Sequence, residues 1–370
     1  MKIDAVDSSG FSLALAGGGT GGHLLPGLHL LAWFQRLERR PTRVIWFTAG
    51  RAIEERVFRQ HEPGDYAFER VALALEPSGG GAPSIARTVL RAGPETLRAR
   101  RALRRSKARV LVGLGGYTSV PAILAAKSLG LPIVLLEINA TIGRATRAAS
   151  GLASVVVHAW PASVPPGAGA RHRVLGPPLA PVLADDLPPA TEARLVVLGG
   201  SQGALGLNRF VAEHAAALVR GGFEIVHQVG PGRLREAAPP LAGYTAVEYV
   251  DDVPALLATA RLALVRGGAS TLAEVAARRV PAVVVPYPHH ADRHQAKNAA
   301  ALGAGVEIVE ESALSTRTVA RLLALGGEAG GAERARMRAA LEQAFDREAG
   351  RRLAELVGDL ALGPAQIAPV

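Results

Sequence analysis

The sequence contains no cysteine, few aromatic residues and only four lysines. The first two shortages each exclude a class of binding site. Without cysteine, its 370 residues can form neither disulfides nor thiolate metal sites, which fits a reducing compartment. Aromatic side chains make up 4% and are absent from the most basic segment, so no base-stacking surface and no nucleic-acid partner are predicted. No uninterrupted apolar run reaches the roughly 18 to 20 residues that cross a bilayer.

The composition otherwise predicts a globular protein with two cores. Hydrophobic residues make up 49% of the chain and charged residues 20%, and 370 residues are enough for two domains. The first seven residues include acidic residues and no long apolar segment, so a signal peptide is not expected. We therefore expect a cytoplasmic protein that is soluble or at most peripheral to a membrane.

The positive charge is concentrated in one segment. The net charge is +10, from 42 basic and 32 acidic residues. Between Arg87 and Arg109, eight arginines and one lysine face a single acidic residue, Glu95, and the apolar Ile85, Val89 and Leu90 lie beside them. Such a segment can bind an anionic membrane surface at about 1 kcal/mol for each basic residue near it. The alternative is a solvated basic helix face.

Short apolar runs alternate with longer helical patterns along the whole chain, which predicts an α/β fold. Continuous apolar strands separated by helices are typical of parallel sheets covered on both faces, so we expect two Rossmann-like, doubly wound domains facing a cleft. The expected strands are Phe11–Ala16, Arg43–Phe47, Phe68–Leu73, Val110–Leu114, Ile133–Leu136, Ser154–His158, Leu195–Leu198, Glu224–Val229, Thr245–Tyr249, Leu262–Val265, Ala282–Val285 and Val306–Ile308.

The expected domain boundaries follow from a segment rich in proline and glycine. This segment, Pro161–Pro189, is the predicted hinge. We expect an N-terminal domain over residues 1–179, a C-terminal domain over 180–345 and a helical tail over 346–370, with amphipathic helices between Glu333 and Leu362. In open α/β sheets, ligands bind at the carboxyl ends of the strands, so the informative residues are those just after each strand.

The first such turn, Gly17–Gly22, holds five glycines in six residues, and a helix is expected to open at His23. Glycine lets backbone N–H groups approach a ligand, and the helix N-terminus adds positive potential, so this turn suits a diphosphate. It matches the dinucleotide pattern GxGxxG, but a nicotinamide site also needs an acid at the tip of the second strand, where Thr48–Arg51 has none.

A second glycine turn, Gly199–Ala204, follows the strand Leu195–Leu198. It also matches the GxSxG nucleophile elbow of hydrolases, with Asp251 or Asp252 and His290 or His294 downstream as triad partners. That interpretation leaves the N-terminal half without a role. No lysine follows a glycine as in a Walker loop, so nucleotide hydrolysis by that device is excluded.

Further polar groups follow other strands. Gly113–Ser119 is a third glycine turn, and Glu137 and Asn139 follow the next strand. Arg266–Thr271 opens a helix that carries Glu274, whose carboxylate can accept hydrogen bonds from ribose hydroxyls. A cluster of His289, His290, Asp292 and His294 invites a metal hypothesis, but it lacks the HExxH spacing and an acidic cluster, so a polar loop is the better interpretation and no metal or cofactor is expected.

Five of these motifs occur together in an order and spacing that closely resemble one family. They are Gly18-Gly19-Thr20-Gly21-Gly22-His23-x-x-Pro26, Gly115-Gly116-Tyr117-x-Ser119, Gly199-Gly200-Ser201-Gln202-Gly203-Ala204, Gly267-Gly268-Ala269-x-Thr271-x-x-Glu274 and Asp292-x-x-Gln295-x-x-Asn298-Ala299. The family is the MurG family, the UDP-N-acetylglucosamine:undecaprenyl-pyrophosphoryl-muramyl-pentapeptide N-acetylglucosaminyltransferases. The resemblance extends from about Phe11 to Ala340.

The resemblance implies a GT-B fold and a metal-independent, inverting transfer of GlcNAc from UDP-GlcNAc to the C4 hydroxyl of MurNAc-pentapeptide on undecaprenyl diphosphate (lipid I to lipid II). That reaction belongs to peptidoglycan synthesis, and so to cell-wall biogenesis, cell shape and cell division, at the cytoplasmic face of the inner membrane. It further implies that His23 is the general base. The implied donor-binding residues are Thr20, Gly21, Gly22, Asn139, Ser201, Val250, Ala269, Ser270, Thr271, Leu272, Ala273, Glu274 and Gln295.

Two departures from the family pattern affect the expected donor site. The family often has His-Glu-Gln-Asn where this chain has Leu136–Asn139, and an arginine of an Asn-Pro-Val-Arg run where this chain has Ala180. Arg266, or another arginine, is the expected substitute. A glycosyltransferase with another sugar or lipid acceptor, or a non-catalytic nucleotide-sugar-binding protein, remains an alternative.

Overall fold

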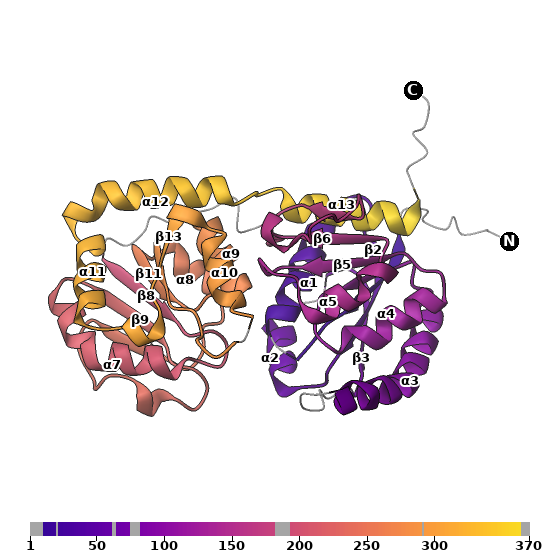
Figure 1. Cartoon of the computed structure of the whole chain (residues 1–370), viewed down its shortest axis with the longest axis horizontal. Helices are drawn as coiled ribbons and strands as arrows, with labels where there is room; N and C mark the ends of the chain where they lie inside the picture. The colour runs from indigo at the N-terminus through magenta and orange to yellow at the C-terminus, as the bar shows by residue number, and fades with distance from the viewer. Residues whose placement is uncertain are drawn as a thin grey trace, which may run out of the picture. The chain divides into compact units, whose positions relative to one another are not determined.

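The computed structural model describes residues 10–19, 21–60, 64–74, 82–181, 193–290 and 292–363, which form two compact units. Unit 1 comprises residues 1–138, 142–181 and 348–370, and unit 2 comprises 139–141 and 182–347 (Figure 1). Among the described residues, no helix combines the length and apolar character that crossing a membrane requires.

Unit 1 is built on a parallel sheet of seven strands in the order β3-β2-β1-β4-β5-β6-β7. The reversal between β1 and β4 is the switch point of a doubly wound sheet. The strands are β1 (Phe11–Ala16), β2 (Pro41–Thr48), β3 (Ala67–Ala72), β4 (Val110–Gly113), β5 (Ile133–Glu137), β6 (Val155–His158) and β7 (His172–Val174).

Helices cover both faces of this sheet because successive side chains of each central strand point to opposite sides. In β1, Leu13 and Leu15 join one core, while Ala14 and Ala16 join the other. The first core holds α1 (Gly21–Phe34), α2 (Ala52–Gln60) and α13 (Ala349–Leu362); the second holds α3 (Ala82–Arg105), α4 (Ser119–Ser128) and α5 (Arg144–Ala149). Strands buried on both faces explain the continuous apolar runs of the sequence.

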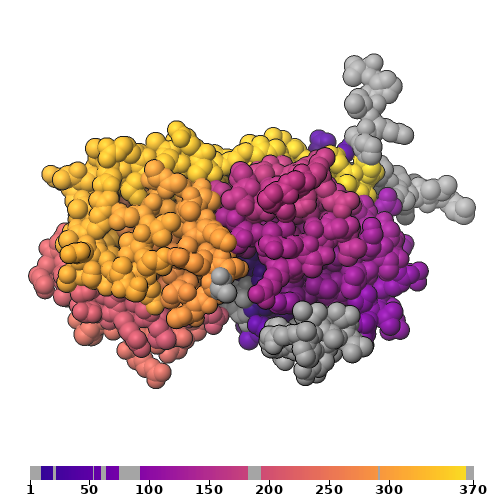
Figure 2. All heavy atoms as spheres, in the orientation of Figure 1, coloured from indigo at the N-terminus to yellow at the C-terminus, as the bar shows by residue number. Residues whose placement is uncertain are grey.

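The C-terminal helix α13 is part of unit 1, although it lies at the far end of the sequence. Its Gly350 approaches Trp33 of α1 so closely that a Cβ there would lie 2.1 Å from the indole nitrogen. Arg352 donates a hydrogen bond to the Leu175 carbonyl at 3.1 Å, and Asp359 pairs with Arg39 at 3.1 Å. In Figure 2 the yellow atoms of this helix lie against the indigo and magenta atoms of unit 1.

Unit 2 repeats the design with six parallel strands in the order β10-β9-β8-β11-β12-β13. The strands are β8 (Arg194–Leu198), β9 (Glu224–Gln228), β10 (Tyr244–Val247), β11 (Leu262–Val265), β12 (Ala282–Val284) and β13 (Val306–Ile308). The helices are α7 (Leu205–Arg220), α8 (Val253–Ala258), α9 (Ala269–Ala277), α10 (His294–Ala300), α11 (Thr316–Gly326) and α12 (Gly331–Ala344). Val197, Val211 and Leu322 share a core between this sheet, α7 and α11.

The predicted α/β fold with two Rossmann-like parallel sheets is confirmed, and all twelve expected strands are present within a few residues. One strand was missed: β7 lies inside Pro161–Pro189, the segment predicted as a hinge. It is a three-residue edge strand of sequence His-Arg-Val whose last two residues are exposed, so no apolar run marks it. Residues up to Pro181 belong to unit 1, and residues 182–192 lie outside the described part.

Candidate functional site

In unit 1, His23 lies in the first turn of α1, at the carboxyl end of the sheet. Its imidazole Nδ1 is 3.3 Å from the carbonyl oxygen of Gly18. A carbonyl only accepts, so this contact places the proton on Nδ1 and leaves Nε2 as the nitrogen able to take a proton. Burial lowers the pKa of His23, while the Gly18 carbonyl and the charge of Glu137 act in the opposite direction.

The third glycine turn packs against this imidazole. Gly115 and Gly116 have φ of 93° and 75°, a region that favours glycine. A Cβ on Gly115 would lie 3.4 Å from the ring Cδ2 of His23, and one on Gly116 would lie 3.3 Å from Cε1 and Nδ1. The turn after β4 therefore packs closely against His23. This close packing explains why both positions are glycine.

The turn after β2 contributes a residue that the sequence analysis did not single out. The buried carboxylate of Glu54, at the start of α2, accepts a hydrogen bond from the backbone N–H of Gly19 at 2.6 Å. That N–H of the first glycine turn is thus already bonded inside the protein, contrary to the expectation that the turn's backbone groups face a diphosphate. The sequence signal was a glutamate at the third position of a helix, where it can cap the helix N-terminus.

Glu137 ends β5 close to the same region. Its side chain is buried and accepts a hydrogen bond from the Gly143 N–H at 2.7 Å. The carboxylate thereby fixes the loop between β5 and α5 and supplies negative charge near His23. Thr20, one of the predicted donor-binding residues, lies outside the described residues, between the described Gly19 and α1, which begins with Gly21 and Gly22.

In unit 2, the start of α9 gathers several predicted donor-binding residues. Gly268 precedes the helix, so the N–H groups of Ala269, Ser270 and Thr271 occupy the first turn and have no partner within the helix. Within the described residues, the buried hydroxyl of Ser270 has no hydrogen-bond partner. An anion or polar ligand at this terminus would form hydrogen bonds with these N–H groups and with the Ser270 hydroxyl.

Glu274 lies one turn further along α9 and is 5% exposed. Among the described residues, no group donates a hydrogen bond to its carboxylate. Burial, with the nearby charge of Asp252, raises the pKa of Glu274 to about 8. Burying a carboxyl group that accepts no hydrogen bond costs free energy. A strongly perturbed pKa is typical of a functional site.

The second glycine turn lies beside α9 because β8 and β11 are neighbours in the sheet. Gly200 and Gly203 have φ of 83° and 71°, and the Gly203 N–H bonds the Gly200 carbonyl at 2.8 Å. A Cβ on Gly203 would lie 2.0 Å from the Val229 carbonyl oxygen, so the turn has no room for a larger residue. Half-buried Ser201 lies within it, next to the expected donor site.

Gln295 and Asn298 of α10 tie the neighbouring turns together. Gln295 Oε1 accepts from the Gly267 N–H at 3.2 Å and the Tyr287 N–H at 2.9 Å. Asn298 Nδ2 donates to the Gly267 carbonyl at 3.0 Å and to Asn139 Oδ1 at 3.1 Å. The side-chain oxygen of Gln295 thus has a structural role, and Asn139, which is grouped with unit 2, is anchored by α10.

The remaining predicted donor-binding residues differ in whether their side chain or only their backbone can contact a ligand. Val250 is half-buried in the turn after β10, whereas the side chains of Leu272 and Ala273 are buried in the core, so those two can meet a ligand only through their backbone. Most predicted donor residues are thus gathered at the carboxyl end of the unit 2 sheet. Gly21, Gly22 and His23 are at the carboxyl end of the unit 1 sheet.

Arg266 was expected to replace the missing hinge arginine, but its guanidinium is already bound. It donates to the carbonyl oxygens of Val285 and Pro286 at 3.1 and 3.2 Å and pairs with Glu311. Ala180 itself follows Leu179, whose carbonyl accepts from Trp33 Nε1 at 2.6 Å. Arg266 therefore stabilises unit 2, and its charge is largely neutralised.

The arrangement opposes a serine hydrolase. Across the described residues, no hydrogen bond joins Ser201 to a histidine; His294 Nδ1 pairs instead with Asp292 at 2.8 Å, and Asp252 caps α8 through the Ala255 N–H at 2.8 Å. Within the same described ranges, no three histidine, aspartate or glutamate side chains are placed to hold a metal ion.

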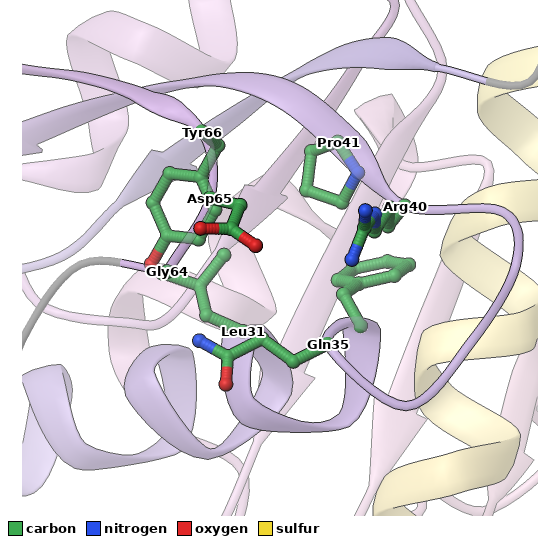
Figure 3. A pocket seen from close by; sticks show the side chains of 8 residues that line it. Leu31, Gln35, Arg40, Pro41, Gly64, Asp65 and Tyr66 are labelled. Carbon is green, nitrogen blue, oxygen red and sulfur yellow. The ribbon is translucent and has the colours of Figure 1, made fainter.

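A cavity of about 300 Å³ in unit 1 lies away from these groups. Figure 3 shows its lining side chains, which include Leu31, Arg40 and Tyr66. Pro41, which also lines it, is the first residue of β2, so the cavity lies at the amino ends of the strands, opposite the turns that carry His23 and Glu54. It is no part of the candidate site.

Comparisons with known proteins show the fold and the family. The profile of the glycosyltransferase family 28 N-terminal domain matches residues 13–157, and that of the C-terminal domain matches residues 194–350. The crystal structure of Acinetobacter baumannii MurG superposes with a TM-score of 0.67 at 24% identity, covering 94% of this chain and 99% of that one. The calicheamicin glycosyltransferase CalG4 gives 0.62 at 18% identity, covering 97% and 100%; these two similarities show the fold.

Curated relatives show the family. A UDP-N-acetylglucosamine--N-acetylmuramyl-(pentapeptide) pyrophosphoryl-undecaprenol N-acetylglucosamine transferase of Sorangium cellulosum is 37% identical, over 95% of this chain and 89% of that protein. A Synechococcus protein of the same name is 36% identical, over 94% and 98%. The chain therefore belongs to the MurG family of glycosyltransferases, as its motifs predicted.

Proposed function

We propose that this chain transfers GlcNAc from UDP-GlcNAc to the C4 hydroxyl of MurNAc-pentapeptide carried on undecaprenyl diphosphate, with inversion at the anomeric carbon. The observation that carries this proposal is Glu274, a buried carboxyl group to which no described residue donates a hydrogen bond. It lies one turn after a helix N-terminus where the Ser270 hydroxyl has no partner among the described residues. A nucleoside diphosphate sugar supplies both missing partners. Its ribose hydroxyls would donate to Glu274, and its diphosphate would accept from the start of α9.

The donor would be held by unit 2. Ser201, in the second glycine turn, and the N–H groups of Ala269, Ser270 and Thr271 would contact the diphosphate. Gln295 and Asn139 are assigned to the same donor site. Backbone N–H groups and the α9 dipole stabilise negative charge on the departing UDP without a metal ion. Thr20, Gly21 and Gly22 of unit 1 are also proposed to bind the donor.

His23 would act as the general base. Nε2 of its imidazole removes the proton from the acceptor C4 hydroxyl as that oxygen attacks the anomeric carbon of GlcNAc. The bond from that carbon to the UDP oxygen breaks, and its electron pair leaves with UDP. The lowered pKa of His23 keeps the imidazole neutral near pH 7, as a base requires.

The acceptor would bind to unit 1, at the cytoplasmic face of the inner membrane. Its polyprenyl tail stays in the bilayer, because each buried CH₂ stabilises it there by about 0.8 kcal/mol, so the enzyme must bind the membrane peripherally. We assign the anionic membrane contact to α3, where Leu97 is 56% exposed and Arg98, Arg101 and Arg104 are exposed. Ile85, Val89 and Leu90, also predicted to contribute, have side chains outside the described part.

The test is turnover of UDP-GlcNAc with a lipid-linked muramyl-pentapeptide acceptor, followed by mass spectrometry of the product. The expected result is one GlcNAc added for each acceptor, with release of UDP. Transfer only to a diacylglycerol or sterol acceptor would replace this proposal with a related glycosyltransferase. Binding of UDP-GlcNAc without turnover would indicate a non-catalytic nucleotide-sugar-binding protein.

A further inference from the structure

The carboxylate of Glu54 binds four backbone N–H groups. Oε1 accepts from Gly19 at 2.6 Å and Ala49 at 3.0 Å, and Oε2 accepts from Gly50 at 2.8 Å and Arg51 at 3.0 Å. The side chain is 2% exposed. Four donors fill the four lone-pair positions of a carboxylate, so this side chain has no capacity left for a ligand.

Capping of α2 explains only part of this arrangement. Arg51 is the residue before the helix, and a glutamate at the third helical position commonly reaches back to that N–H. The bond to Gly19 is different, because it joins α2 to the first glycine turn across 35 residues. The contact is also tight: a Cβ on Gly18 would lie 2.4 Å from Oε1 of Glu54.

The Gly19 N–H and the Gly18 carbonyl belong to one peptide group. In a trans peptide these two groups point in opposite directions, and no cis peptide occurs in the described chain. Glu54 binds the N–H end of this group, while Nδ1 of His23 lies 3.3 Å from its carbonyl oxygen. Holding one end therefore sets the direction of the other, and negative charge at the N–H makes the carbonyl a better acceptor.

We propose that Glu54 is a positioning residue for the transfer reaction: it holds the Gly18–Gly19 peptide so that the Gly18 carbonyl fixes His23 as the Nδ1–H tautomer, with Nε2 ready to accept the proton. The proposal rests on the proposed role of His23 as the base. The arrangement places a carboxylate, a peptide group and an imidazole in series, much as a carboxylate alone orients the histidine of a catalytic triad.

The first measurement is the tautomer of His23 in the full-length protein, by ¹⁵N NMR of labelled histidine, with the signal assigned by its loss in His23→Ala. The wild type is expected to show the Nδ1–H form. Glu54→Gln is expected to give a mixture of tautomers, because its amide NH₂ opposes two of the backbone donors. A wild-type Nε2–H form would overturn the proposal even if the variant failed to fold.

The second measurement is a double-mutant cycle on kcat. Glu54→Gln is expected to lower kcat roughly 10- to 100-fold, with KM for UDP-GlcNAc changed less than about 2-fold. In a His23→Ala background, Glu54→Gln should lower kcat no further, because the imidazole through which Glu54 acts has been removed. Equal losses in both backgrounds would assign Glu54 a purely structural role and overturn the proposal.

Two variants serve as controls. Glu55→Gln removes the same charge from the neighbouring residue, an exposed glutamate paired with Arg70 at 2.8 Å, and should leave the His23 tautomer and kcat unchanged. Glu54→Asp keeps the charge but is one methylene shorter, and should weaken the Gly19 contact while folding normally. If the wild type transfers no GlcNAc, the proposed function fails, yet the NMR experiment still tests the link between Glu54 and His23.

Discussion

Burial of Glu274 raises the pKa of its carboxyl group, and the nearby charge of Asp252 adds to this effect although the two residues belong to different elements of unit 2. Asp252 caps α8 through the Ala255 N–H at 2.8 Å, so its charge is held in place by that helix. Glu274 projects from α9, and burial together with this charge raises its pKa to about 8. The protein thus maintains a carboxyl in an environment that disfavours its ionised form.

This raised pKa predicts how stability depends on pH. Between pH 4.5 and about 8 the folded protein binds more protons at Glu274 than the unfolded chain does, so the free energy of unfolding falls as pH rises. Glu274→Gln cannot ionise, so it avoids this loss of stability. The loss amounts to about 1.4 kcal/mol for each unit by which the pKa of the folded state exceeds that of the unfolded chain. Urea denaturation should find the variant more stable than the wild type at pH 8, and the difference should shrink towards pH 4.5. Equal stability at pH 8 would contradict the assignment.

The same residue predicts a loss of donor affinity. Hydrogen bonds from the ribose hydroxyls favour the ionised form of Glu274 when the donor is bound. Glu274→Ala removes this acceptor and should weaken UDP-GlcNAc binding by roughly 1.5 to 3 kcal/mol, the usual contribution of a charged hydrogen bond. Titration calorimetry gives the dissociation constant directly. Glu213→Ala, which removes a 74% exposed glutamate of the same unit, is the control and should bind the donor normally. An unchanged affinity in Glu274→Ala would place the ribose elsewhere.

Replacing His23 should separate catalysis from donor binding. His23→Ala is expected to lower kcat by about 10²- to 10⁴-fold, since general-base catalysis contributes on that scale, with little change in donor affinity. The check is steady-state kinetics beside calorimetry on the same preparation. Near-normal turnover would leave His23 as a helix-start residue that packs against Gly115 and Gly116.

Ser201 distinguishes transfer from hydrolysis. A hydroxyl that contacts phosphate contributes about 1 kcal/mol, so Ser201→Ala should weaken donor binding by no more than roughly tenfold. A serine hydrolase would lose essentially all activity with the same change. Labelling with a fluorophosphonate provides an independent test, because only an activated serine reacts. Covalent modification at Ser201 would favour the hydrolase.

The sequence predicted the elements of the fold because the buried strands are continuous apolar runs and the turns after them need glycine. Gly19, Gly115 and Gly200, with φ of 88°, 93° and 83°, lie in three turns identified from composition alone. The edge strand β7 could not be found this way, since it buries too little apolar surface to leave a pattern.

Individual residues of the candidate site could be predicted only where they belong to a recognisable sequence motif. The bond between Glu54 and Gly19 spans 35 residues, and the sequence indicates at most that Glu54 caps its own helix. The pKa of Glu274 depends on its burial and on Asp252 in another turn, and the pairing of Arg266 with Glu311 depends on the packing of unit 2. Contacts of this kind come from tertiary structure, which local patterns do not encode.

The exposed face of α3 predicts salt-sensitive binding to anionic membranes. Arg100 donates to the Ser128 carbonyl at 2.9 Å and Arg105 pairs with Glu69, so their charges are partly used within the protein. No such contact engages Arg101 or Arg104 within the described chain, and both are exposed. These two should therefore contribute most to the attraction, at about 1 kcal/mol each near the surface.

Vesicle sedimentation tests this assignment. Changing Arg100, Arg101, Arg104 and Arg105 together to serine should release the protein from anionic vesicles, and the Arg101→Ser and Arg104→Ser pair should produce most of that loss. A matched control, Arg336→Ser with Arg338→Ser, removes two exposed charges from α12 of the other unit and should bind as the wild type does. Binding should also fall as salt rises, because charges are screened beyond roughly 8 to 10 Å at physiological ionic strength. Equal binding to neutral and anionic vesicles, or full binding by the fourfold variant, would exclude this face of α3 as the membrane contact.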